Sequence, residues 1–128
     1  MKITGQRFSV LPGIHAICRL EPHSAVPAWA AGSFVSITRT EDEVSIICPA
    51  GGVPAGVNAD RAWRVLKILG PFSFATTGVL ASLTAPLATA GISVLSIATF
   101  DTDYLLLKSK SLDDAVTALV MAGHERID

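Results

Sequence analysis

The segment TTGVLASLTAPLATAGISVLSIATFDTDYLLLK, residues 76–108, decides the fold class because its periodicity changes part-way along. Thr76 and Thr77 are N-cap residues for a helix whose apolar residues recur at helical spacing. Residues 92–100 and 104–108 are rich in β-branched and apolar side chains and are separated by the turn-forming sequence Asp-Thr-Asp. The segment therefore predicts a helix followed by a β-hairpin.

The sequence on either side of this segment predicts a complete folding unit. Residues 63–69 alternate in polarity at first and end at Gly-Pro, which is typical of a strand. Residues 111–123 have a capping-box pattern at Ser111, apolar residues on one face and a glycine at the end, which predicts a second helix. Residues 124–128 supply a short last strand. The predicted order is β-α-β-β-α-β, the ferredoxin-like arrangement.

An internal repeat predicts a second copy of this unit. SITRTEDEVSIIC at 36–48 matches SIATFDTDYLLLK at 96–108 with an offset of sixty residues, so the chain contains two related units. The first copy has only short Pro/Gly-rich stretches at 25–31 and 52–58 for its helices, although 8–11 and 14–20 add strand-like sequence. We expect an α+β protein of two tandem ferredoxin-like βαββαβ units, the first degenerate, with antiparallel sheets and helices on one face. The expected boundaries are 1–61 and 62–128.

Composition limits the classes of partner. The 128 residues are 50% hydrophobic and only 16% charged, with a formal net charge of −1. Disorder needs low hydrophobicity, and nucleic-acid binding normally needs a basic excess, so we expect neither. Residues 68–100 contain no ionisable side chain, but prolines, glycines and nine Ser/Thr residues interrupt them. We therefore expect no transmembrane span, and without an apolar signal region we expect a cytoplasmic protein.

The cysteine and histidine residues are not spaced as in a known catalytic or metal-binding motif. Cys18 and Cys48 form no C-x-x-C pair and are expected to be buried free thiols. His15 lies three positions before Cys18, so on a strand the two side chains point to opposite faces and predict no metal site. His124 is isolated and is expected to be an ordinary surface or edge residue. With no nucleophile motif and no dinucleotide fingerprint, we expect a non-enzyme without a cofactor.

Residues 70–124 and 33–49 together resemble the small stand-alone bacterial proteins with tandem ACT domains. The combination T-G-V-L-A-S-L, A-G-I-S and S-x-x-T-F-D-T-D-Y-L-L-L-K is similar to the ACT modules of lysine-sensitive aspartokinases and of the CASTOR arginine sensors. This resemblance implies paired βαββαβ units with sheets side by side, and amino-acid ligands bound at unit interfaces.

The residues themselves offer groups for the two charges of an amino acid. A helix start at residues 76–79 suits a carboxylate, while Asp101 and Asp103 suit an ammonium or a basic side chain. The resemblance implies that a neighbouring copy adds residues 92–94 and that Asp103 is the nearer acid. The predicted ligand-binding residues are Thr76, Thr77, Gly78, Val79, Ile92, Ser93, Val94, Phe100, Asp101, Thr102 and Asp103.

Plainer interpretations of these residues stay open. The threonines can be caps only, and the aspartates can be turn formers only. The leading hypothesis is a non-catalytic amino-acid sensor that forms a homodimer, with the uncharged helix face against a partner helix. The alternative is a structural or partner-binding module with a vestigial site, and an enzyme ranks third. The sequence leaves open which amino acid binds and whether the assembly is a dimer or a tetramer.

Overall fold

The computed structural model describes residues 5–69 and 77–128. In chain order the elements are β1 (Arg7–Val10), β2 (His15–Leu20), β3 (Ser36–Arg39), β4 (Val44–Pro49), the 3-10 turn η1 (Ala50–Gly52), β5 (Ala59–Ile68), α1 (Val79–Thr89), β6 (Val94–Ala98), β7 (Asp103–Lys108), the 3-10 turn η2 (Ser109–Ser111), α2 (Leu112–Met121) and β8 (Glu125–Arg126). They form two compact units. The αβ unit consists of Met1–Pro12 and Arg64–Asp128, and the β unit consists of Gly13–Trp63.

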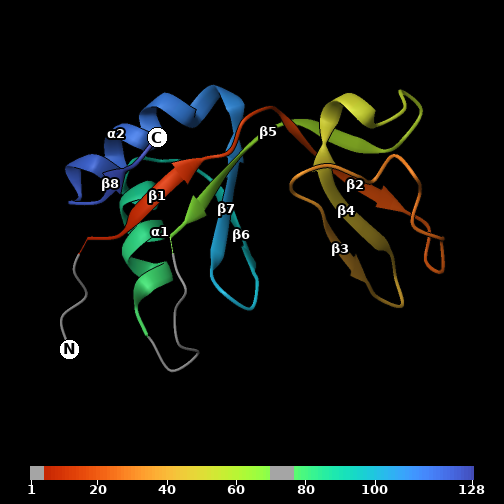
Figure 1. The fold of residues 1–128 in the computed structure, drawn as a ribbon, viewed down its shortest axis with the longest axis horizontal. Helices are drawn as coiled ribbons and strands as arrows, with labels where there is room; N and C mark the ends of the chain where they lie inside the picture. The colour runs from red at the N-terminus through yellow and green to blue at the C-terminus, as the bar shows by residue number, and fades with distance from the viewer. Residues whose placement is uncertain (1–4, 70–76) are drawn as a thin grey trace. The chain divides into compact units, whose positions relative to one another are not determined.

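The αβ unit has the predicted β-α-β-β-α-β order, from β5 to β8 (Figure 1). Its strands are ordered β6-β7-β5-β1-β8, and β6 pairs with β7 antiparallel. Alternate strand residues and the inner faces of both helices form one core, which contains Phe8, Val10, Leu66, Ile68, Val79, Leu83, Leu87, Leu105, Leu107, Ala115 and Leu119. Both helices therefore cover the same face of the sheet, and the α+β prediction is confirmed.

Strand β1 lies in the sheet of the αβ unit, although it comes first in the sequence. It pairs antiparallel with β5 and parallel with β8. Its alternating residues Phe8 and Val10 are buried in the core of that unit, so apolar burial keeps the strand there. The two units therefore do not meet at a single boundary at residue 61, because β1 belongs with the C-terminal half of the chain.

The β unit is a sheet covered by irregular chain rather than by helices. Strand β2 lies between β4 and the start of β5, and β3 lies at the edge beside β4. Its core consists of Ala16, Cys18, Val44, Ile46, Cys48 and Val53. Within Gly13–Trp63, all of which is described, no α-helix forms, so the helices expected at 25–31 and 52–58 are absent. Pro27 and Pro54 fall inside these short stretches and disfavour a helix of useful length.

At the ends of the helices, the predicted terminal glycine is confirmed, but the predicted capping by the Ser111 side chain is not. Gly91 and Gly123 follow the two helices with positive φ, and Gly123 is the glycine that was predicted to end the second helix. Ser111 occupies the N-cap position of α2, but its side chain makes no cap hydrogen bond. It ends the η2 turn with φ −97° and ψ 0°, not in the extended conformation that lets a cap side chain reach the free N–H groups.

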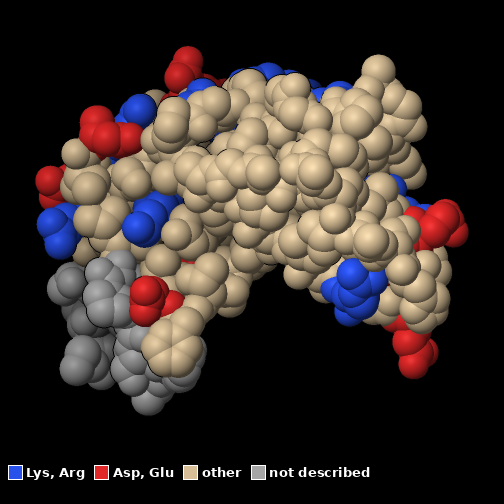
Figure 2. Space-filling view, turned by 45° about the vertical axis from the view of Figure 1, so that its right-hand side comes forward, with Lys and Arg blue, Asp and Glu red and all other residues tan. Residues whose placement is uncertain are grey.

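Charge is sparse on the surface of the described residues. On the face in Figure 2, uncharged residues cover most of the area, and Lys and Arg side chains are interspersed with Asp and Glu. Across residues 5–69 and 77–128, no helix combines the length and apolarity that a membrane crossing requires.

Candidate ligand-binding site

No side chain of the described residues, 5–69 and 77–128, caps the N-terminus of α1. Its N-cap residue is Gly78, with φ 81°, and no side chain makes a cap hydrogen bond there. The expectation that Thr77 caps the helix is therefore wrong, while Thr76 lies outside the described residues. The first intrahelical bond runs from the Ser82 N–H to the Gly78 carbonyl at 2.9 Å. The N–H groups of the first turn, beginning at Val79, have no intrahelical acceptor and can serve an anion.

The turn between β6 and β7 is held by two threonines. The Thr99 N–H donates to the Thr102 carbonyl at 2.8 Å, and the Thr102 N–H donates to Thr99 Oγ1 at 3.3 Å. This turn leaves Phe100 at its apex, 81% exposed, beside the exposed Asp101. Both predicted site residues thus lie at the tip, whereas the bonds that fix the tip come from the threonines.

Thr102 also ties the hairpin to the end of β5. Its side chain is buried, and its hydroxyl donates to the Ile68 carbonyl at 2.6 Å. Thr102 is one of the predicted ligand-binding residues, and its hydroxyl bonds the protein backbone in this structure. The hairpin turn, the end of β5 and the start of α1 lie at the same end of the αβ unit (Figure 1).

Asp103 is directed differently from Asp101. Along β7, Asp103, Leu105 and Leu107 alternate onto one face, and the two leucines belong to the core beneath the helices. Asp103 is half-buried and shares that helix-covered face, at the end of the sheet where α1 begins. The structure therefore places a carboxylate and an uncapped helix N-terminus on the same side of the sheet and at the same end.

The three predicted residues at and just before the start of β6, Ile92, Ser93 and Val94, do not join this group within one chain. Ile92 is a core residue, Ser93 is exposed and Val94 is half-buried. They lie at the opposite end of β6 from the hairpin turn (Figure 1). At a rise of about 3.3 Å per residue, Ser93 and Thr99 are roughly 20 Å apart along the strand. Within one chain, therefore, these three residues do not lie near the hairpin turn.

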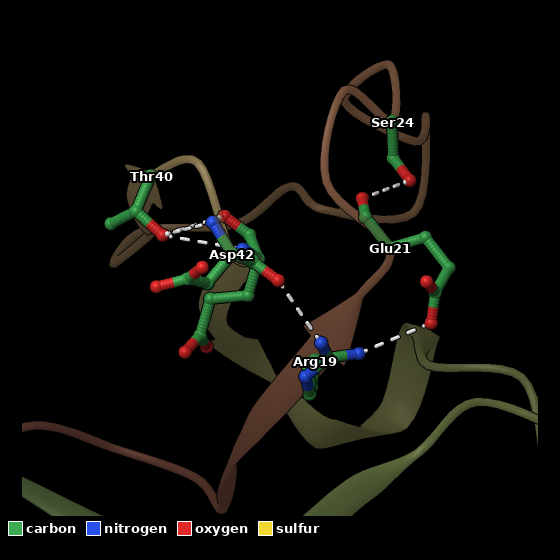
Figure 3. Close-up of polar contacts among 6 residues, drawn as sticks. Arg19, Glu21, Ser24, Thr40 and Asp42 are labelled. Carbon is green, nitrogen blue, oxygen red and sulfur yellow. Dashed lines mark hydrogen bonds and ion pairs between the residues drawn. The ribbon is translucent and has the colours of Figure 1, made fainter.

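The corresponding hairpin in the β unit shows the same turn. The Thr40 N–H donates to the Glu43 carbonyl at 3.0 Å, and Thr40 Oγ1 accepts from the Asp42 and Glu43 N–H groups. Figure 3 shows Arg19 holding this turn, with one bond to the Asp42 carbonyl and another to the Glu21 carboxylate. In the β unit, therefore, the guanidinium of Arg19 binds the backbone of the hairpin turn, at the Asp42 carbonyl.

Strand registers correct the alignment of the two hairpins by one residue. Ser36 pairs with Ile47 in the first hairpin, and Val94 pairs with Leu107 in the second. The turns and strands therefore correspond at an offset of 59 residues rather than the 60 of the sequence match. At this offset Asp103 corresponds to Val44, a buried residue of the β unit, which agrees with an Asp103 side chain on the covered face.

Models of known families match both parts of the chain. The ACT domain model matches residues 58–120, and a model of an N-terminal domain matches residues 13–56. A structural-genomics protein from Agobacterium tumefaciens is 41% identical, with 98% of this chain and 94% of that chain covered and a TM-score of 0.92. This chain belongs to the ACT-domain family.

More distant structures share the fold. A protein of unknown function from Vibrio cholerae, described as a possible transport protein, has a TM-score of 0.77 at 16% identity, with 93% of this chain and 91% of that chain covered. The ligand-free regulatory subunit of aspartate kinase from Thermus thermophilus has a TM-score of 0.63 at 12% identity, with 94% and 99% covered. The resemblance to aspartokinase modules is thus confirmed at the level of the fold.

His124 is a buried structural residue of the ACT domain, not the isolated surface or edge residue that the sequence indicated. Its Nδ1 accepts the Gln6 N–H at 2.9 Å, so its Nε2 carries the proton and donates to the Ser82 carbonyl at 2.8 Å. Pro86, four residues after Ser82, has no N–H to give that carbonyl. The signal that sequence reasoning missed was the carbonyl that a mid-helix proline leaves without a helical donor.

The two cysteines are free and buried, as predicted. They lie on the neighbouring strands β2 and β4, where Cys18 pairs with Ile46 and Ala16 pairs with Cys48. Burial, together with the neighbouring Cys48 thiol, raises the pKa of Cys18 from 9.0 to about 11. Burial also raises the pKa of Cys48. Within the described part of the chain no group of three or more His, Cys, Asp or Glu residues is arranged to hold a metal ion.

Proposed function

We propose that this ACT-domain protein is a non-catalytic regulatory module that binds a free amino acid. The observation that supports this most is that Asp103, at the start of β7, lies on the helix-covered face of the sheet and at the end of the sheet where α1 begins. A helix N-terminus favours a carboxylate and Asp103 favours an ammonium, so together they match the two charges of an α-amino acid. The two buried free thiols fit a reducing compartment, and on that ground we assign the protein to the cytoplasm.

The proposal includes a homodimer in which residues 92–94 of one copy complete the site of the other. Within one chain these residues are too far from the hairpin turn to touch the same small ligand. The exposed residues of α1, which include Ala81, Ala85 and Ala88, carry no charge, and a partner helix would cover them at little desolvation cost.

A thermal-shift screen against the twenty amino acids tests the proposed ligand class. A ligand at 100 times its dissociation constant adds about 2.7 kcal/mol to the free energy of unfolding, so at least one amino acid should raise the melting temperature by several degrees. Asp103→Asn should remove most of that increase. Asp101→Asn, at the exposed apex, is the matched control and should keep it. A screen in which no amino acid stabilises the wild type at millimolar concentration would exclude this function.

A partner-binding module is the second candidate, favoured by the 81% exposed ring of Phe100. Large exposed aromatic side chains are enriched where proteins bind one another. Phe100→Ser should then abolish capture of a partner in a pull-down and leave any amino-acid stabilisation unchanged. If Phe100→Ser instead weakens the ligand response, the ring belongs to the ligand site and the second candidate fails.

A further inference from the structure

The segment just before β1 is attached to the corner between α2 and β8. The Gln6 N–H donates to His124 Nδ1 at 2.9 Å, and the Gln6 carbonyl accepts the Glu125 N–H at 2.9 Å. Gly5 packs so closely at this corner that a Cβ atom on it would overlap the Gly123 carbonyl oxygen. The His124 ring therefore lies where the N-terminal end of β1 joins the rest of the αβ unit.

Only one of the two hydrogen bonds of the His124 ring depends on its protonation state. Nε2 donates to the Ser82 carbonyl at 2.8 Å, and a cationic ring keeps this bond because both of its nitrogens are donors. Nδ1 accepts the Gln6 N–H, so a proton on Nδ1 would place two donors against each other. Protonation therefore removes the contact with the N-terminal segment and keeps the contact with α1.

We infer that His124 is a proton-sensitive latch for the N-terminal end of β1. With a neutral ring the latch is closed, and the Gln6 N–H is bonded to Nδ1. A proton taken from solvent onto Nδ1 opens the latch, because Gln6 loses this acceptor and moves away with Gly5, while the ring stays bonded to Ser82. An imidazole in water changes its charge at about pH 6.5, so the latch opens on the acid side of neutrality.

The elements around the ring contain few charged side chains. Helix α1 has none, and the described charged residues of β1, α2 and the C-terminal segment are Arg7, Asp113, Asp114, Glu125, Arg126 and Asp128. All six are exposed, and Asp128 bonds Arg126 and the Val10 N–H. The C-terminal end of α2 directly precedes His124 and favours a positive charge there. The bond from Gln6 is therefore the contact that opposes protonation of the ring.

The opening of the latch is linked to pH through a single proton. Because one proton is taken up for each opening, the equilibrium constant for opening rises by up to about tenfold for each pH unit over which the ring titrates. The Gln6 contact is complete while the ring is neutral and is lost as the pH falls. This behaviour needs no bound amino acid, so it is independent of the proposed function.

Amide hydrogen exchange of the full chain, followed by NMR, tests the latch. After correction for the pH dependence of intrinsic exchange, the protection of the Gln6 N–H should fall by about tenfold or more between about pH 7.5 and about pH 5.5. The Ala90 N–H, which bonds the Pro86 carbonyl at the end of α1, should keep its protection. Nitrogen-15 spectra of the ring should show an unprotonated Nδ1 at the higher pH and a protonated Nδ1 at the lower pH.

The double variant Pro86→Ala/His124→Asn removes the titratable group and keeps both backbone partners. The carboxamide oxygen at position 124 stands in for Nδ1 and accepts the Gln6 N–H at any pH, while the new N–H at position 86 bonds the Ser82 carbonyl. Protection of Gln6 in this variant should not change with pH. His23→Asn, which removes an exposed histidine of the β unit, is the matched control and should keep the pH dependence of the wild type.

Three results would each overturn the latch. The first is a Gln6 N–H that stays protected while the ring is seen to be protonated at Nδ1. The second is a ring that is still neutral at about pH 5.5. The third is a double variant whose Gln6 protection falls with acid as in the wild type. All of these measurements use the protein without an amino acid, so their outcome and that of the thermal-shift screen are separate.

Discussion

At the scale of single residues, one buried imidazole explains how α1 tolerates a proline in its interior. Pro86 removes the N–H that would bond the Ser82 carbonyl, and His124 Nε2 donates to that carbonyl instead. The same ring accepts the N–H of Gln6, just before β1. A substitution at His124 therefore affects a helix and a strand that are distant in sequence.

We predict that His124→Ala lowers the free energy of unfolding by about 2–3 kcal/mol, since it leaves two backbone groups without their partner. In a Pro86→Ala background the loss should be about 1 kcal/mol smaller, because the alanine N–H can bond the Ser82 carbonyl. Urea denaturation of the four proteins in this double-mutant cycle measures both values. Met121→Ala, at a side chain that is 83% exposed, is the control and should change stability by less than about 0.5 kcal/mol.

The raised pKa of the Cys18 thiol makes the free energy of unfolding depend on pH in the alkaline range. Its folded pKa of about 11 lies above the ordinary 9.0, so folding favours the protonated thiol. This contribution is complete below pH 9 and is lost as the pH rises from 9 to 11. Between these pH values the wild type should lose more stability than a Cys18→Ala/Cys48→Ala variant. Equal pH dependence of the two proteins in urea denaturation would contradict the assignment.

At the scale of elements, the β6–β7 hairpin shows how a short turn is held in place. Thr99 and Thr102 bond each other across the turn, and Thr102 then bonds the last residue of β5. The aspartates in the same segment are the more conspicuous residues in the sequence. The structure assigns the positioning role to the threonines.

We predict that Thr102→Val lowers the free energy of unfolding by about 1–2 kcal/mol, because the buried Ile68 carbonyl loses its donor while side-chain volume is conserved. It should also weaken the amino-acid response, since Asp103 is the next residue. Thermal unfolding with and without ligand measures both effects. Thr117→Val, at an exposed position of α2, provides the comparison and should leave both nearly unchanged.

At the scale of the whole molecule, the first strand in the sequence, β1, belongs to the sheet of the αβ unit, most of which comes from the C-terminal half of the chain. Strand β1 lies between β5 and β8 in the sheet. The β unit, Gly13–Trp63, follows β1 in the sequence and forms its own core. The N-terminal segment is therefore part of the fold of the C-terminal half.

We predict that Phe8→Ala lowers the free energy of unfolding of the αβ unit by about 3–5 kcal/mol, as expected for a fully buried aromatic ring. Hydrogen exchange should show faster exchange in β5 and β8 and little change in β3 and β4. Ile14→Ala, at a side chain that is 40% exposed, is the control and should have a small effect. Faster exchange in β3 and β4 after Phe8→Ala would contradict the separate cores.

Much of the αβ unit could be predicted because its signals are local. Helix spacing, terminal glycines and a polar turn between two apolar runs each depend on neighbouring residues only. Insertion of β1 next to β5 could not be predicted, because strand pairing across more than fifty residues leaves no local pattern. The helices expected in the β unit do not form. They were expected because of the internal repeat, but the local sequence disfavours them, since Pro27 and Pro54 lie inside the two short stretches.

The sequence by itself determined the order of elements from β5 to β8, the family and the acids worth testing. Only the tertiary structure decided that Asp103 and the start of α1 share one face, that Thr102 is structural and that residues 92–94 lie at the far end of β6. The physical reason is that residue type and periodicity are carried along the chain. The direction of a side chain and the partner of a strand depend on which distant segments pack together.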